Sequence, residues 1–120
     1  MDIKLEAKIF RKARFYQIKR IHHSFISGAK YKNTRISKSS GELLEEDIYS
    51  SELEKALTFF GNIGTKYNKS TIGFCAEVHS VNSVCQIRNI KKISLIEVGS
   101  AIRPRTMQKG KKCVICKKIF

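Results

Sequence analysis

Three cysteines and one glutamate in the C-terminal half have the residue types and spacing of a catalytic metal site. Cys113 and Cys116 form a Cys-x-x-Cys pair, the commonest spacing for two thiolates that chelate one ion, and Cys75 can supply a third thiolate. Glu77 lies two residues after Cys75. Zinc is bound by thiolates in a tetrahedron, and a catalytic zinc site keeps one position for water. These residues therefore predict a zinc ion on three cysteines, beside a carboxylate that can move protons.

The fourth cysteine, Cys85, is not expected to join this site. Residues 75–90 have a helical apolar pattern, and within one helix Cys75 and Cys85 would lie about 15 Å apart along the axis. Because both cannot reach one ion, Cys85 is expected in the core. Three protein ligands leave an open position, which favours a catalytic metal over a structural one.

Glu77 is expected in the first turn of that helix. From there its carboxylate can approach whatever lies in front of the helix end and can transfer protons. The alternative is an acidic residue that is stabilised by the positive end of the helix dipole, which is common. The three cysteines favour the proton-transfer role.

A mixed α/β domain is expected to position these side chains. The spacing of apolar residues predicts a basic amphipathic helix over residues 3–26, broken at most once. A short strand or hairpin is expected around residues 29–36, within a polar stretch. A second helix is expected from Ser50 or Ser51 to about residue 60, ended by Gly61. Residues 61–70 are expected to form a loop.

The segment that carries the site is expected to begin with a mostly buried helix from residue 75 to about residue 90. A mostly buried strand is predicted over residues 92–98. A basic loop over residues 103–112 then leads to a short helix that begins near Cys113. The helix, the strand and the returning loop together suggest half of a βαβ-like layer arrangement.

Composition indicates a single basic domain. The chain has 120 residues, enough for one core, so residues 1–120 are expected to form one domain. Lys and Arg outnumber Asp and Glu by 24 to 10, which gives a net charge of +14. This charge exceeds what solubility requires and attracts polyanions, above all nucleic acid. No stretch is apolar over the thickness of a bilayer, and the first residues do not resemble a signal peptide.

Three segments together carry a family resemblance. They are Phe74-Cys75-Ala76-Glu77-Val78-His79-Ser80-Val81-Asn82, Arg103-Pro104-Arg105 and Gly110-Lys111-Lys112-Cys113-Val114-Ile115-Cys116. They resemble the YwqJ-like deaminases of bacterial polymorphic toxins, which belong to the cytidine deaminase-like superfamily, over about residues 72–118. The resemblance implies a three-layer α/β/α fold with a small central sheet. It also implies zinc on Cys75, Cys113 and Cys116, with Glu77 as the proton shuttle.

The same resemblance implies a biological setting. The domain would be the C-terminal toxin part of a secreted or delivered effector that acts in the cytoplasm of a target cell. A cognate immunity protein would mask it in the producing cell. Two features depart from the superfamily pattern: Lys112 replaces the proline that usually precedes the cysteine pair, and few residues follow Cys116. The sheet is therefore expected to be short, or to be completed by strands from the first seventy residues.

Three further residues are candidates for substrate binding. His79 could contact the substrate or make a structural hydrogen bond. Arg103 and Arg105 could hold a phosphate of the substrate or belong to a solvated loop.

The leading hypothesis is a zinc-dependent hydrolytic deaminase that converts cytosine to uracil in nucleic acid or in a nucleotide. Adenine stays open as the target, because the choice of base depends on the shape of the pocket. One alternative is a non-catalytic zinc-containing nucleic-acid-binding module, in which a fourth protein ligand would complete the metal site. Another is a metal-independent ribonuclease toxin that uses a histidine such as His22 or His23.

Overall fold

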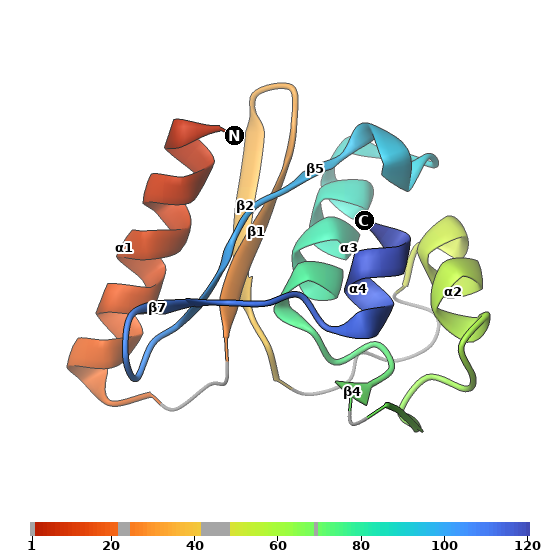
Figure 1. Ribbon diagram of the computed structural model, residues 1–120. Coiled ribbons are helices and arrows are strands. Elements are labelled where there is room, and N and C mark those ends of the chain that lie inside the picture. Colours follow the sequence, from red (N-terminus) through yellow and green to blue (C-terminus); the bar gives the residue numbers. More distant parts are fainter. Residues whose placement is uncertain (1, 22–24, 42–48, 69) are drawn as a thin grey trace.

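A β-hairpin from the N-terminal half lies at the centre of the computed structural model (Figure 1). Strand β1 (Ile26–Tyr31) pairs antiparallel with β2 (Thr34–Ser39), from Ile26 opposite Ser39 to Tyr31 opposite Thr34. The expected hairpin is confirmed, and its strands extend beyond residues 29–36. The structure describes residues 2–21, 25–41, 49–68 and 70–120.

Three short strands from the C-terminal half complete the sheet. Strand β6 (Ala101–Arg103) pairs with β1 and with β7 (Gln108–Gly110), and β5 (Glu97–Val98) also pairs with β1. The order is β2-β1-β6-β7, and every pairing among the described residues is antiparallel. Strands from the first seventy residues therefore complete the sheet, as expected. The expectation of a βαβ-like arrangement is wrong for this part of the chain, because such a unit requires parallel strands.

Most of the segment expected as a strand over residues 92–98 has another conformation. Residues Ile93–Leu95 form one 3-10 turn, and only β5 is extended in the sheet. Ile93 and Ile96 are buried, whereas Leu95 is 57% exposed. Side chains three residues apart share one side of a 3-10 turn, so this spacing fits a turn better than a strand. The basic loop expected over residues 103–112 likewise contains the β6–β7 turn and strand β7.

Helix α1 (Ile3–Lys19) covers one face of the sheet (Figure 1). It begins after Asp2, whose carboxylate accepts a hydrogen bond from the Leu5 N–H at 2.6 Å. It ends at Arg20, which has a left-handed φ of 57°. The helix expected over residues 3–26 therefore stops early, because the chain must reverse to bring Ile26 into the sheet. Its buried side chains join an apolar cluster made of Leu5, Ile9, Ala13, Ile26 and Ile102.

Two glycines allow α1 to lie close to the sheet. A Cβ atom at Gly99 would lie 2.5 Å from Cδ1 of Ile9. A Cβ atom at Gly28 would lie 2.9 Å from Cδ1 of Leu5. Both distances are shorter than two non-bonded carbon atoms tolerate. The helix could therefore not keep this position if alanine replaced either glycine.

Helices also lie on the other side of the sheet (Figure 1). Helix α3 (Ala76–Arg88) packs against the hairpin, and α2 (Ser51–Thr58) and α4 (Val114–Ile119) lie on the same side. The helices expected from residue 75 and from Ser50 or Ser51 are confirmed. The larger apolar cluster includes Ala29, Leu53, Leu57, Val78, Val81, Val84, Cys85 and Ile115. The fold is thus mixed α/β, with helices on both faces of a small antiparallel sheet.

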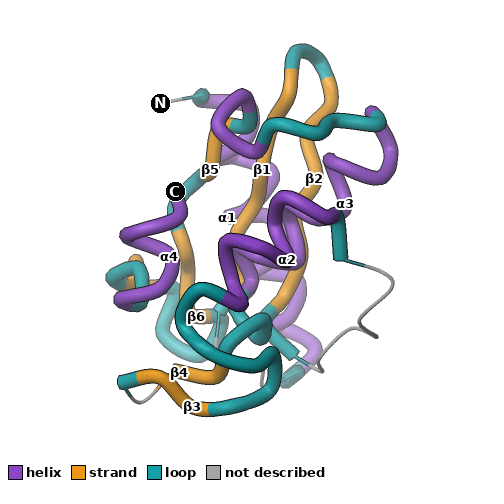
Figure 2. Tube along the Cα trace, turned by 90° about the vertical axis from the view of Figure 1, so that its right-hand side faces the viewer, coloured by secondary structure: helices purple, strands orange, loops and turns teal. Residues whose placement is uncertain are grey.

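The segment between α2 and α3 is more regular than the expected loop. It contains two short antiparallel strands, β3 (Lys66–Tyr67) and β4 (Ser70–Thr71), which precede α3 in the chain (Figure 2). None of the helices within the described ranges combines the length and apolarity that a membrane span requires.

Candidate metal centre

Two helix N-termini bring the three cysteines together. Cys75 is the N-cap of α3 and Cys113 is the N-cap of α4, and Cys116 lies in the first turn of α4. The Sγ atoms of Cys75 and Cys113 are 3.4 Å apart, and the Cys116 N–H donates to the Cys113 Sγ at 3.4 Å. All three sulfur atoms lie within 4.8 Å of one another. Among the described residues, this is the group of His, Cys, Asp and Glu side chains that could hold a metal ion.

The spacing of the sulfur atoms fits a zinc ion. Zn–S bonds of about 2.3 Å in a tetrahedron place two sulfurs about 3.8 Å apart. That value lies between the 3.4 Å that separates the Sγ atoms of Cys75 and Cys113 and the 4.8 Å within which all three sulfur atoms lie. Cys85 does not belong to the group: it is 3% exposed in the core on the later turns of α3, as expected. Within the described part of the chain three thiols thus converge, and these three ligands leave the fourth position of a tetrahedral ion open.

Among the three thiols, Cys113 loses its proton first. Hydrogen bonds from the thiols of Cys116 and Cys75 lower the pKa of Cys113 to about 2, and the Ser70 hydroxyl adds to this effect. The same contacts, with burial, raise the pKa of Cys75 to about 12 and raise that of Cys116 well above its ordinary value. A bound cation would lower the raised pKa values of Cys75 and Cys116, because it stabilises all three thiolates.

Glu77 is buried beside the thiols. It lies in the first turn of α3, as expected, and is only 4% exposed. Burial raises the pKa of its carboxyl, and the nearby Cys113 charge raises it further, whereas Lys112 acts in the opposite direction. The residue that replaces the usual proline therefore provides a positive charge near this carboxyl. A carboxyl with a raised pKa can hold a proton closer to neutral pH, as a general acid or base requires.

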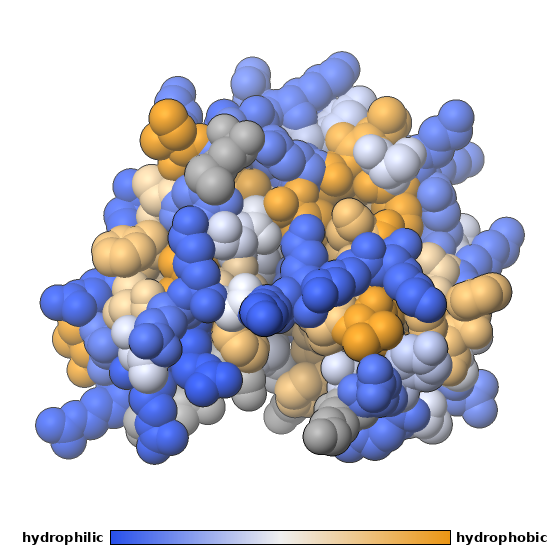
Figure 3. Space-filling model, in the orientation of Figure 1, coloured by the Kyte–Doolittle hydropathy of each residue, from blue (hydrophilic) through white to orange (hydrophobic). Residues whose placement is uncertain are grey.

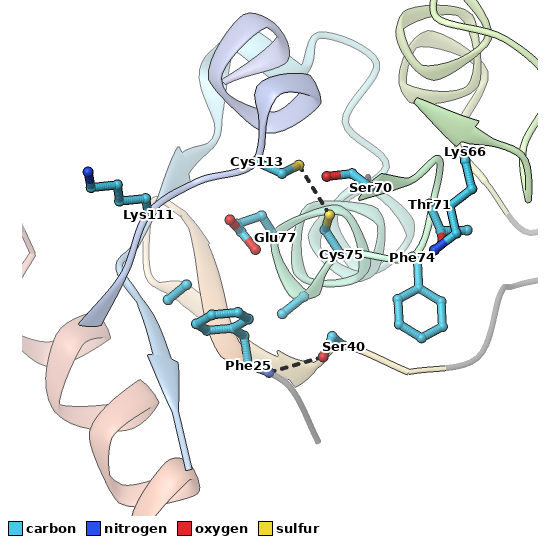
Figure 4. A pocket seen from close by; sticks show the side chains of 12 residues that line it. Phe25, Ser40, Lys66, Ser70, Thr71, Phe74, Cys75, Glu77, Lys111 and Cys113 are labelled. Carbon is cyan, nitrogen blue, oxygen red and sulfur yellow. Dashed lines mark hydrogen bonds between the residues drawn. The ribbon is translucent and has the colours of Figure 1, made fainter. Parts of the chain in front are cut away.

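A cavity of about 290 Å³ opens in front of these groups. Figure 4 shows Glu77, Cys75 and Cys113 around its inner part and two phenylalanine rings farther out. Cys116 is fully buried and does not line the cavity. The volume suits a small organic ligand. The lining residues are Phe25, Ser40, Lys66, Ser70, Thr71, Phe74, Cys75, Ala76, Glu77, Ala101, Lys111 and Cys113.

The three candidates for substrate binding do not line this cavity. His79 is buried within α3. Arg103 is exposed, and its guanidinium lies 5.2 Å from the centre of the Phe25 ring. Arg105 is also exposed, and its carbonyl accepts a hydrogen bond from Gln17 at 3.5 Å. Their roles in substrate binding stay predictions. His22 and His23, the histidines of the ribonuclease alternative, lie outside the described residues.

Among the side chains of the cavity wall that the sequence analysis did not assign to the site are Phe25, Lys66, Phe74 and Lys111. Phe74 directly precedes Cys75, and Lys111 lies two residues before Cys113, so proximity to the ligands was a usable signal for both. Phe25 and Lys66 are far from the motif in sequence. Only the sheet and the pairing of β3 with β4 bring them to the site.

Comparisons of the chain with protein-family models, with curated proteins and with solved structures give no match. The thiol cluster and the cavity therefore carry the functional argument.

Proposed function

We propose that this protein is a zinc-dependent nucleobase deaminase that converts cytosine to uracil in nucleic acid or in a nucleotide. The observation that carries the proposal is the convergence of three thiols within 4.8 Å, next to a buried glutamate, on a cavity of about 290 Å³. Cys75, Cys113 and Cys116 would hold the ion. Zinc in such a site supplies Lewis acidity, which lowers the pKa of water to about 7.

Glu77 carries the proton transfers in this proposal. Hydrolytic deamination replaces the exocyclic amino group of the base by an oxygen from water and releases ammonia. Glu77 would accept a proton from the attacking water, pass it to the ring nitrogen and assist protonation of the departing amine. Its burial next to the thiols supports this role, because burial raises the pKa of the carboxyl above its ordinary value and so favours its protonated form.

The wider proposal follows the family resemblance. A three-layer α/β/α deaminase-like fold is supported by α1 on one face of the sheet and α3 on the other. We further propose that the domain is the toxin part of a secreted or delivered bacterial effector, acts in the target-cell cytoplasm and is masked by an immunity protein. The motif residues around Cys75 and Cys113 support this setting.

The test measures zinc content and base conversion in DNA and RNA that have been exposed to the protein. We expect one zinc per chain and C-to-U changes in sequencing reads. Glu77→Gln should keep the zinc but reduce conversion by about 10²-fold or more. Glu52→Gln is the matched control, because Glu52 also lies in the first turn of a helix, α2, but outside the cavity.

The two alternatives predict other results. For a non-catalytic zinc module, zinc would be present and no base would change. For a metal-independent ribonuclease, strands would be cut and chelators would have no effect. Zinc loss in Cys75→Ser but not in Cys85→Ser identifies the ligands, and strand cleavage without base conversion would sink the proposal.

A further inference from the structure

The outer wall of the cavity contains an aromatic ring that is fixed before any ligand arrives. The Phe25 N–H donates to the Ser40 hydroxyl at 3.1 Å, and the Ser40 N–H donates to the Phe25 carbonyl at 2.8 Å. The Arg103 guanidinium lies 5.2 Å from the ring centre. A Cβ atom at Gly110 would lie only 2.2 Å from Cε1 of Phe25. The ring therefore has little freedom to lose when it binds a ligand.

A second ring, that of Phe74, stands on another side of the same cavity (Figure 4). It lies immediately before Cys75 and is 37% exposed, so part of its ring is accessible to a ligand in the cavity. Two phenyl rings at the outer part of a cavity are suited to a flat aromatic ligand. Stacking of nucleobases on such rings tolerates any base, because every base has a π face.

Two lysines, Lys66 of β3 and Lys111 after β7, line the cavity from opposite sides (Figure 4). Both are exposed, and they are the cations among the lining residues. The Lys66 ammonium extends toward Phe74, whereas the Lys111 ammonium extends outward from the rim. Hydrophilic side chains also cover much of the face around the terminal segment (Figure 3). One cation on each side fits a ligand whose negative charges continue in both directions from the ring.

We propose that the cavity receives an unpaired base of a single-stranded nucleic acid, with Phe25 and Phe74 contacting the base and Lys66 and Lys111 contacting the phosphates on either side. The inference rests on the proposed function, since it names the substrate class of that site. A free nucleotide has phosphate on only one side of its base. A base in a duplex is stacked and paired, and must be extruded before it can enter such a cavity.

The test measures binding without turnover. Labelled oligothymidylate and oligouridylate of about 12 nucleotides are titrated with the protein in fluorescence anisotropy, over a range of salt concentrations. Neither oligomer has an exocyclic amino group, so the result does not depend on deamination. The two oligomers compare DNA with RNA. A duplex of the same length and the nucleoside monophosphates serve as competitors.

Stacking is tested with Phe74→Ala, which should weaken binding by about 5- to 150-fold. Phe59→Ala is the control, because Phe59 is 83% exposed and does not line the cavity. Gly110→Ala should also weaken binding, because its Cβ would displace the Phe25 ring without removing any side chain. Circular dichroism of each variant shows that the fold is intact.

Phosphate contacts are tested with the double variant Lys66→Gln, Lys111→Gln. In a plot of the logarithm of the association constant against the logarithm of the salt concentration, the slope should decrease by about 1.4 in magnitude. The reason is that two fewer phosphates of a single strand are neutralised. The control Lys55→Gln, Lys91→Gln removes the same charge from two exposed lysines that do not line the cavity, and should change the slope much less.

Equal effects of the two lysine pairs would overturn the inference, since binding would then reflect diffuse charge alone. Equal effects of Phe74→Ala and Phe59→Ala would also overturn it, as would monophosphates or duplex that bind as tightly as the single strands. Failure of the proposed function is a separate result: it appears as absent base conversion, whatever these titrations give.

Discussion

Cys113 carries the negative charge of the thiol cluster in the metal-free protein. It accepts hydrogen bonds from two neighbouring thiols and from the Cys116 N–H, so its pKa falls to about 2 while those of Cys75 and Cys116 rise. At neutral pH the cluster therefore holds one thiolate and two thiols. Zinc binds thiolates, so the two thiols must lose their protons when the ion binds.

This charge state predicts the proton count of metal uptake. At pH 6, below the pKa of about 7 of zinc-bound water, zinc binding to the metal-free protein should release two protons per ion, from Cys75 and Cys116. Isothermal titration calorimetry in buffers of different ionisation enthalpy measures that number. Release of three protons would show that Cys113 is not a thiolate before the metal arrives.

At the scale of elements, Asp2 connects the start of α1 to the hairpin. Its carboxylate caps the helix and also pairs with Lys30 of β1 and Arg35 of β2, each at 2.9 Å. The hydrogen bond from Arg35, followed by that from Lys30, lowers the pKa of Asp2 well below its ordinary value of 3.8. The ionised form thus stabilises the fold above pH 3.8, and this contribution is lost as the pH falls through the lowered pKa.

Asp2→Asn should lower the urea midpoint at pH 7, and its difference from wild type should shrink as the pH falls below about 4. Asp2→Ser keeps an oxygen that can cap α1 but removes the ion pairs with Lys30 and Arg35. Its midpoint should lie between those of wild type and Asp2→Ala. Urea titrations at several pH values measure these differences, and a pH-independent difference would contradict the assigned charge effect.

The contact between α1 and β5–β6 predicts a specific steric coupling. Gly99→Ala should destabilise the protein by about 1–3 kcal/mol, because its Cβ would lie 2.5 Å from Cδ1 of Ile9. Ile9→Val removes that Cδ1 atom. In the double variant, the cost should therefore be smaller than the sum of the two single costs. Urea denaturation of the four proteins gives the coupling energy, and additive costs would exclude this contact as the cause.

At the scale of the whole molecule, the candidate metal centre joins the short helix α4 to the start of α3. Helix α4 has six residues, too few for stability on its own, and its N-cap and first turn supply two of the three thiols. Cys75 anchors the same centre at the start of α3. Helix α1 and the hairpin are held instead by their own apolar cluster and by strand pairing.

Removal of zinc should therefore act locally. In hydrogen–deuterium exchange, chelation should speed exchange in residues 111–120 and in the first turn of α3. It should leave α1 and the β1–β2 hairpin nearly unchanged. A uniform increase over the whole chain would mean that the metal stabilises the fold globally.

Local patterns predicted the helices and the thiol cluster well. The start of α2 at Ser50 and the apolar positions of α3 are local features, as is the short spacing of Cys113 and Cys116. The sheet depends on contacts between segments that are distant in the sequence, so local patterns could not predict its extent. Ile21 and Phe25 continue the helical spacing of α1, yet the chain reverses at Arg20 because Ile26 pairs with Ser39 and Ile102.

The antiparallel sheet has a consequence for synthesis of the protein. Strand β1 is made early, but its partners β5 and β6 are made much later, and Glu6 accepts hydrogen bonds from Ser100. Lys111 and Cys113, which line the cavity, are made later still. Because the ribosome adds residues from the N-terminus onward, a nascent chain that ends before residue 108 lacks both strand β7 and the cysteine pair of the ligand set. If the proposed function holds, a nascent chain that lacks Cys116 would be inactive, because the three thiols cannot yet assemble.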